Sequence, residues 1–200
     1  MAVANEIQQV TPELWVWEAY EPVVKCDLSS AALLVKGGSL LIDPIRLTAD
    51  ALEELTDVAP PQLIVLTNAN HARAAEWYRQ RLGIPIAAHV EAEPELDVQP
   101  DQPLDESAVL PGGISIVPLD GAVPGEIALR TPTGIVCVGD ALIHLEPLGF
   151  SLLPVKYCRD SQQLRNSLRK LLPFACRVLT FAHGSPLVAG AHARLAALLA

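Results

Sequence analysis

The residues best placed to do chemistry follow a short apolar run in the first half of the chain. Residues 63–66 (LIVL) are continuously apolar and come after a Pro-Pro pair, which is typical of a strand buried on both faces. The polar stretch 67–73 (TNANHAR) follows and leads into a helix that we expect over 74–82. Open α/β layers place their sites where a buried strand gives way to a helix. The sequence therefore predicts a site at this strand end.

Other apolar runs indicate the elements that must position this stretch. Helices are expected over 48–58, 74–82, the residues after Asp160 or Ser161, and 191–199, each with apolar residues at helical spacing or a terminating glycine. Strands are expected over 14–20, 31–35, 39–42, 63–66, 84–90, 114–119, 127–130, 134–139 and 178–181. Residues 92–113 are rich in Pro, Asp and Glu, which favours a surface connection between two halves.

The amino-acid composition limits the domain organisation, partners and cellular compartment that we expect. The chain has 200 residues, of which 50% are hydrophobic and 18% charged, so we expect one domain made of two merged halves, roughly 1–100 and 110–200. A net charge of −9 argues against nucleic-acid and anionic-membrane partners, and no apolar run is long enough to span a bilayer. The N-terminus shows no export signal, and the four cysteines form no C-x-x-C pair. These features favour a cytoplasmic protein with reduced thiols.

Four short motifs, each at an expected strand end, resemble segments of the metallo-β-lactamase-fold hydrolases. The stretch 67–73 stands where that family reads Thr-His-x-His-x-Asp-His, and residues 120–126 (DGAVPGE) are similar to its Gly-His-Thr-Pro-Gly turn. Gly139-Asp140 matches its Gly-Asp, and His183-Gly184 matches its closing His-Gly. The resemblance covers nearly the whole chain. It implies an α/β (α+β) fold, a four-layer αββα sandwich with two mixed sheets face to face, and a two-metal centre that activates water.

Most of the metal ligands that the resemblance implies are missing. The sequence keeps Asp140, which bridges the two metals in that family, and His183. The other ligand positions hold Asn68, Asn70, Ala72, Arg73 and Ala122. Amides, methyl groups and a guanidinium do not replace imidazole as zinc ligands. We therefore expect no dinuclear zinc site.

His71 and Asp43 leave alternatives open. His71 lies between two of the ligand positions, so it is either a polar residue at the cleft mouth or joins Asp140 and His183 in one three-ligand site for zinc, iron or manganese. Asp43 follows the run 39–42, where the resembling family has a carboxylate beneath the metal-binding loop. It either supports the loop 67–73 or is a solvated turn residue before proline.

Arg73 suggests a more specific hypothesis. Removing a metal would leave Asp140 partly buried and unpaired, which costs free energy, and a guanidinium can bind a carboxylate through two hydrogen bonds. We therefore expect Arg73 to pair with Asp140. Asn70 is expected to cap the helix that follows, and Asn68 to bind loop backbone.

The remaining candidates are weaker. We interpret His89, His144 and His192 as surface histidines, with His144 close enough in sequence to Asp140 to reach the cleft rim. Neither Ser185 nor Cys137 has a base and an orienting group at recognisable spacing, which argues against a nucleophilic site.

Two functions follow from these residues. In the first, the chain has lost the two-metal reaction, and its cleft binds a small, anionic ligand or docks a partner. In the second, it is a metal-dependent hydrolase of ester, thioester or amide bonds with a mononuclear site. The cleft would be lined by Asn68, Asn70, His71, Arg73, Asp140 and His183. The ligand losses favour the first function, whereas the family resemblance favours the second.

Overall fold

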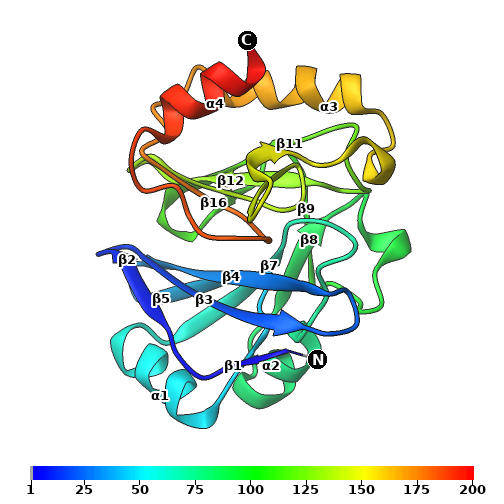
Figure 1. Cartoon of the computed structure of the whole chain (residues 1–200). Coiled ribbons are helices and arrows are strands. Elements are labelled where there is room, and N and C mark those ends of the chain that lie inside the picture. Colours follow the sequence, from blue (N-terminus) through cyan, green and yellow to red (C-terminus); the bar gives the residue numbers. More distant parts are fainter. Residues whose placement is uncertain (1) are drawn as a thin grey trace.

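The computed structural model describes residues 2–200 and has two β-sheets stacked face to face. Figure 1 shows helices α1 and α2 on the outer face of one sheet and α3 and α4 on the outer face of the other. The predicted four-layer αββα arrangement is confirmed. The fold of the chain is therefore the one that the sequence motifs imply.

The first sheet contains seven strands in the order β2-β3-β4-β5-β7-β8-β9. Pairing is antiparallel from β2 to β5 and parallel from β5 to β9, so the sheet is mixed. Two further short strands, β1 and β6, pair with each other. The strands are β1 (Val3–Ala4), β2 (Gln8–Thr11), β3 (Leu14–Glu21), β4 (Cys26–Val35), β5 (Gly38–Ile42), β6 (Arg46–Leu47), β7 (Pro61–Leu66), β8 (Ile86–His89) and β9 (Gln102–Leu104).

The second sheet contains five strands in the order β10-β11-β12-β13-β16, beside a separate hairpin of β14 and β15. The parallel pairing of β13 with β16 brings the carboxyl ends of both strands to one edge. The strands are β10 (Val109–Leu110), β11 (Ile114–Pro118), β12 (Ile127–Arg130), β13 (Ile135–Val138), β14 (Leu142–Leu145), β15 (Gly149–Leu152) and β16 (Val178–Thr180).

The helices begin and end close to the predicted positions. They are α1 (Ala49–Val58), α2 (Ala75–Leu82), α3 (Ser161–Leu168) and α4 (Ala191–Leu199), with single 3-10 turns at Glu93–Glu95, Pro111–Gly113, Val155–Tyr157 and Arg169–Leu171. Asp160 caps α3, because its carboxylate accepts the backbone N–H groups of Gln162 and Gln163. Gly83 ends α2 in the left-handed conformation that glycine adopts easily.

The core has three layers that correspond to the sandwich. Buried residues of both sheets, including Leu40, Val65, Leu129 and Ile135, pack between the two sheets. Two further clusters fill the space between each sheet and its helices. Burial on both faces explains why residues 63–66 of β7 and all of β13 are continuously apolar rather than alternating.

The segment 92–113 differs from the prediction. It is not only a surface connection, because β9 extends the first sheet beside β8 and β10 pairs with β11 in the second. These strands have three and two residues, which is too short for an alternating pattern to be visible.

Within residues 2–200, no helix is both long and apolar enough to cross a bilayer.

Candidate functional site

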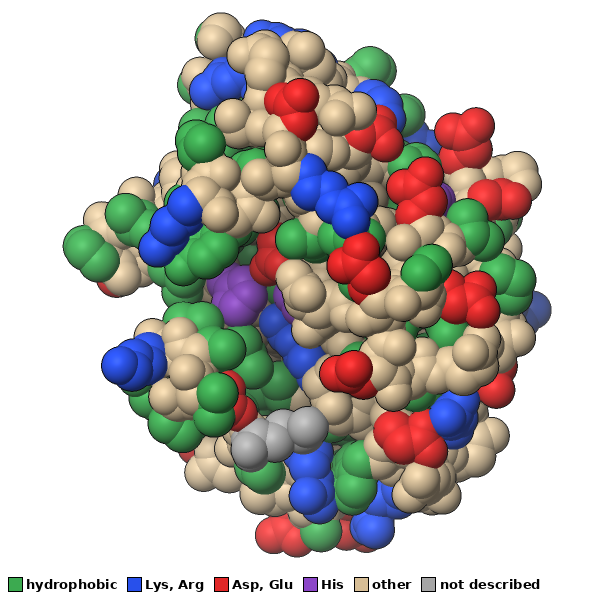
Figure 2. Space-filling view, turned by 90° about the vertical axis from the view of Figure 1, so that its right-hand side faces the viewer, with side chains coloured by type: hydrophobic (Ala, Val, Ile, Leu, Met, Phe, Trp, Pro, Cys, Tyr) green, Lys and Arg blue, Asp and Glu red, His purple; other side chains and the backbone are tan. Residues whose placement is uncertain are grey.

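Four strand ends from two sheets meet at one edge of the sandwich. Asp43 follows β5 and the loop 67–73 follows β7, whereas Asp140 follows β13 and His183 follows β16. Figure 2 shows a hollow between the two halves in which histidine side chains lie next to basic and acidic ones. The parallel pairings of β5 with β7 and of β13 with β16 place these residues together.

Asp140 lies between two imidazoles. Its Oδ1 is 3.3 Å from Nε2 of His71 and 3.3 Å from Nε2 of His183. One donor atom from each of these three residues can be chosen so that all lie within 4.8 Å of one another. Imidazole and carboxylate donors at such spacing suit one divalent metal ion.

The second nitrogen of each imidazole has its own partner. Nδ1 of His71 is 2.9 Å from Oδ2 of Asp43 and 3.1 Å from Oγ1 of Thr67. Nδ1 of His183 is 3.1 Å from the carbonyl oxygen of Asp27 and 3.6 Å from Sγ of Cys26. Partners of this kind fix ring orientation and leave Nε2 facing the site, as metal-ligating histidines require.

Asp43 lies beneath the loop and is buried, with 2% of its surface exposed. Its carboxylate accepts the backbone N–H of Thr67 at 2.7 Å and also the Thr67 hydroxyl. The alternative of a solvated turn residue is therefore wrong. Burial opposes ionisation, but the neighbouring His71 and Arg73 cations hold the pKa of Asp43 below its ordinary value.

Arg73 does not pair with Asp140, contrary to the hypothesis from the sequence. Its guanidinium donates to three backbone carbonyls, those of Ser29 (2.7 Å), Asp43 (3.0 Å) and Ala182 (3.1 Å). Among residues 2–200, the ion pairs of Asp140 are those with His71 and His183. Arg73 has a φ of +39°, and its guanidinium ties strand β4 to the segments that carry Asp43 and His183. The imidazoles of His71 and His183, rather than the guanidinium of Arg73, therefore compensate the charge of Asp140.

Asn68 binds two carboxylates. Its Nδ2 donates to Oε2 of Glu126 at 2.7 Å and to Oδ2 of Asp140 at 3.2 Å, and its Oδ1 accepts the backbone N–H of Asn70. The expected contact of Asn68 with loop backbone is present. The expected helix cap by Asn70 is wrong, because α2 begins at Ala75 and Ala74 is its N-cap residue.

Glu126 is a site residue that the sequence did not single out. It lies in the turn that precedes β12, is 3% exposed, and its Oε1 accepts the backbone N–H of Ala141. Burial and the nearby Asp140 carboxylate raise the pKa of Glu126 to about 8. An acidic residue in a polar turn gives no sequence signal that it will be buried.

The opposite charges of His71 and Asp140 shift the pKa of each other's side chain toward the ionised form. Burial lowers the basicity of His71, but the Asp140 and Asp43 carboxylates outweigh this effect and raise its pKa to about 9. Burial likewise opposes ionisation of Asp140, but His71 and His183 hold its pKa well below the usual range. A metal at Nε2 of His71 must therefore displace a proton at neutral pH.

Of the other candidates, His144 borders the centre, because its backbone N–H donates to the carbonyl oxygen of His183 at 3.0 Å. His144 is half-buried, and its Nδ1 is 2.7 Å from the carbonyl oxygen of Ser185. His89 is 6% exposed, so its interpretation as a surface residue is wrong; it ends β8, whose four residues are all buried. His192 is exposed on α4. Cys137 is buried, and burial raises the pKa of its thiol to about 12.

Comparisons with known proteins agree with the fold. A family model described as "Metallo-beta-lactamase superfamily" matches residues 8–195. The structure is similar to DIM-1 metallo-β-lactamase, with a TM-score of 0.77, 15% identity, and 98% of each chain covered.

Two further solved structures have similar TM-scores, identities and coverages. The metallo-β-lactamase FIM-1 from Pseudomonas aeruginosa, solved in a mono-zinc form, has a TM-score of 0.77 and 18% identity over 98% of this chain and 94% of that one. A metallo-β-lactamase from Pontibacter korlensis has a TM-score of 0.73 and 18% identity over 97% and 98%. No curated protein matches the sequence significantly.

Proposed function

Because this chain belongs to the metallo-β-lactamase superfamily, we propose that it is a divergent metal-dependent hydrolase that has lost the two-metal centre and binds one divalent ion. The ligands would be Nε2 of His71, Oδ1 of Asp140 and Nε2 of His183. The observation that carries this proposal is the convergence of both Nε2 atoms on one carboxylate oxygen, each at 3.3 Å.

The donor set fits a single ion better than a pair. Two imidazoles and a carboxylate suit zinc, iron or manganese and leave a coordination position open. The remaining family ligand positions offer no metal-binding imidazole or carboxylate, since they hold Asn68, Asn70, Ala72, Arg73 and Ala122. The structurally similar FIM-1 enzyme has been solved with one zinc ion.

Each neighbouring residue has a positioning role in this proposal. When bound, the ion would polarise a substrate carbonyl and lower the pKa of a water molecule. Asp43 holds the ring of His71, and the Asp27 carbonyl holds that of His183. Asn68 binds Oδ2 of Asp140, which leaves Oδ1 facing the imidazoles, and Glu126 in turn holds the Asn68 amide. We propose a small-molecule ester, thioester or amide as substrate.

A second candidate function is metal-free binding of a small molecule or a partner. It is favoured by the position of His71, which as an imidazolium between Asp43 and Asp140 balances buried charge without a metal. An anionic ligand at Arg73 has little support, because the guanidinium already donates to three carbonyls. Cytoplasmic location stays a prediction from the sequence.

Metal content tests the proposal and separates the two functions. The chain should be purified without chelator or metal-affinity resin and its metal measured by elemental analysis. We expect about one equivalent of zinc, iron or manganese in the wild type and none in the Asp140→Ala, His183→Ala double variant or in His71→Ala. His192→Ala is the matched control, because it removes an exposed histidine from α4.

The outcomes are distinct. One equivalent that is lost in the site variants but kept in His192→Ala supports the mononuclear centre, and ester and thioester hydrolysis assays on the loaded protein then follow. Two equivalents would contradict the loss of the two-metal centre. Absence of metal from the wild type, even after dialysis against zinc, would overturn the proposal in favour of the metal-free function.

A further inference from the structure

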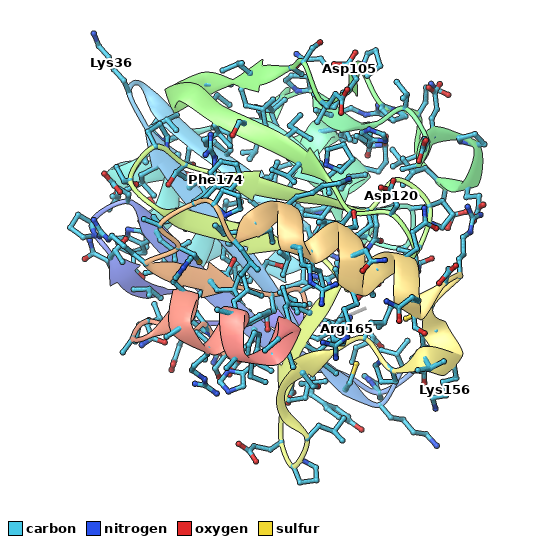
Figure 3. The ribbon with its side chains drawn as sticks, turned by 90° about the horizontal axis from the view of Figure 1, so that it is seen from above. Lys36, Asp105, Asp120, Lys156, Arg165 and Phe174 are labelled. Carbon is cyan, nitrogen blue, oxygen red and sulfur yellow. The ribbon has the colours of Figure 1, made fainter. Side chains whose placement is uncertain are left out.

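A second cavity lies at the end of the second sheet that is remote from the candidate centre. It has a volume of about 560 Å³ and lies between the β12–β13 turn and the segment that precedes β16; its lining includes Arg130, Thr131, Gly134, Phe174 and Arg177. Gly134 and Arg177 directly precede β13 and β16, whereas Asp140 and His183 follow the same two strands. Figure 3 shows Phe174 from above, beside the strands of the second sheet.

Arg130 is held in a fixed position in this cavity. Its Nε donates to Oγ of Ser115 at 3.0 Å, and its guanidinium carbon lies 3.7 Å from the centre of the Phe174 ring. Neither terminal amino group has a hydrogen bond or ion pair to any residue within 2–200. A guanidinium oriented by stacking and one hydrogen bond loses little further entropy when it binds an anion through its free edge.

A second cation shares the cavity. Arg177 is exposed and makes no side-chain hydrogen bond or ion pair with the described part of the chain, and none of the described lining residues is acidic. The cavity wall is closely packed, because a Cβ built on Gly134 would lie 2.6 Å from the carbonyl oxygen of Ala175. Arg130 and Arg177 thus line one cavity without an ion pair to the described part of the chain, although the chain has a net charge of −9.

We propose that this cavity binds an oxyanion, the phosphoryl or carboxylate group of a small molecule, between the guanidinium groups of Arg130 and Arg177. Guanidinium groups match the paired oxygens of both anions. The site is separate from the metal centre, and the proposal does not depend on the proposed function.

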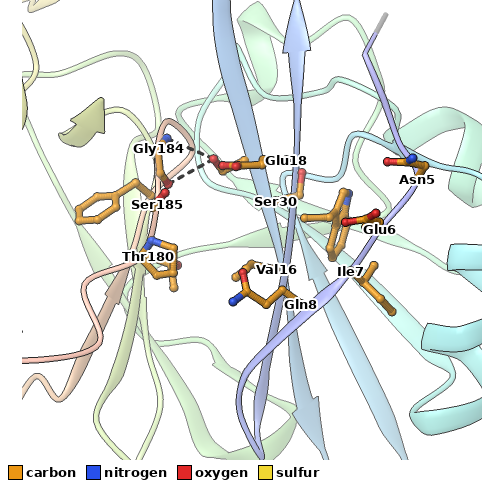
Figure 4. A pocket seen from close by; sticks show the side chains of 14 residues that line it. Asn5, Glu6, Ile7, Gln8, Val16, Glu18, Ser30, Thr180, Gly184 and Ser185 are labelled. Carbon is orange, nitrogen blue, oxygen red and sulfur yellow. Dashed lines mark hydrogen bonds between the residues drawn. The ribbon is translucent and has the colours of Figure 1, made fainter. Parts of the chain in front are cut away.

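The groove that lies along Ser29 and Gly184, shown in Figure 4, differs in its chemistry. Its lining includes the acidic residues Glu6 and Glu18 and no basic residue among those described. Charge therefore favours the arginine-lined cavity as the place for an anion.

Calorimetric titration of the whole chain tests the proposal. The protein, freed of metal by chelator and dialysed, is titrated with inorganic phosphate or with acetate, and sodium chloride keeps the ionic strength constant. We expect saturable binding of at least one of the two anions. Arg177→Gln and Arg130→Gln should each weaken it about tenfold or more, the loss of one charge-assisted contact. Arg81→Gln is the matched control, because Arg81 is also exposed and lies over an aromatic ring, that of Trp77.

Each outcome decides the matter. Binding that is weakened in the two cavity variants but not in Arg81→Gln supports the site, and comparison of phosphate with acetate identifies the preferred anion. Arg177→Gln keeps the test informative if Arg130→Gln does not fold. Binding that neither cavity variant weakens, equal weakening in all three variants, or no binding of either anion would overturn the proposal.

Discussion

Opposite charges stabilise the candidate centre formed by His71, Asp140 and His183. His71 stands between the carboxylates of Asp43 and Asp140, with Nδ1 facing one and Nε2 facing the other. Two buried carboxylates without cations would be strongly destabilising, so the loop must supply either protons or a metal. His71 and Arg73 compensate the charge of Asp43, and His71 and His183 compensate that of Asp140.

Arg73 gives a prediction at the same scale. Replacing it by alanine would leave three carbonyls without their donor, and we expect a loss of about 2–4 kcal/mol in the free energy of unfolding, measured by urea denaturation at pH 7.5. Arg73→Lys should lose less, because an ammonium can reach some of these acceptors. If Arg73 instead served mainly to neutralise Asp140, Arg73→Lys would be as stable as the wild type.

At the scale of elements, two parallel strand pairs build the site. Strands β5 and β7 deliver Asp43 and the loop 67–73, and β13 and β16 deliver Asp140 and His183. Parallel neighbours end at the same edge, so residues far apart in sequence meet without any special loop. The antiparallel strand β4 adds supporting contacts, because the Asp27 carbonyl lies against His183 and the Ser29 carbonyl accepts from Arg73.

Asp101 stabilises the edge of the first sheet through contacts with β8 and α2. Its carboxylate accepts the backbone N–H of Ile86 at 2.9 Å and pairs with Arg79, and these contacts lower its pKa in the folded protein. A folded pKa below the unfolded value contributes stability that is present above about pH 4 and lost as the pH falls through the folded pKa. Asp101→Asn should therefore be less stable than the wild type by up to about 1 kcal/mol at pH 6, with the difference shrinking below pH 4.

Urea midpoints measured between pH 6 and pH 3 check this expectation. Asp97→Asn, which changes another exposed acid of the same segment, is the matched control. A constant difference between Asp101→Asn and the wild type across this range would show that ionisation of Asp101 does not stabilise the fold.

At the scale of the whole molecule, we propose that the two halves form one cooperative domain. Both halves contribute residues to the apolar layer between the sheets. Burial of a shared core of this kind makes independent folding of either half unfavourable. All three tryptophans, Trp15, Trp17 and Trp77, lie in the first half, so their fluorescence reports on that half alone.

A substitution in the second half tests this cooperativity. Leu195 is fully buried between α4 and the second sheet, and Leu195→Ala should cost about 2–5 kcal/mol. We expect the urea midpoints from tryptophan fluorescence and from far-ultraviolet circular dichroism to fall together. A fluorescence midpoint that stays at the wild-type value while the dichroism transition moves or splits would indicate two independent units.

The amino-acid sequence by itself determined the order of buried strands, the helices and the segments that come together. Continuous apolar runs such as 63–66 and 134–139 can be recognised as strands because a strand buried on both faces carries apolar residues at nearly every position. The motifs placed Asp140 and His183 at strand ends, and residue type alone argues against Asn68 and Ala122 as zinc ligands. These inferences need only local pattern and residue type.

The tertiary structure alone decided how the side chains of the loop are used. Residues 67–73 follow no repeating backbone geometry, so periodicity cannot say that His71 turns toward Asp140 while Arg73 turns toward backbone carbonyls. The burial of Glu126 and His89 and the pairing of β9 and β10 depend on which distant segments cover them. Contacts between residues far apart in the chain fixed these features, and a single sequence carries no local trace of such contacts.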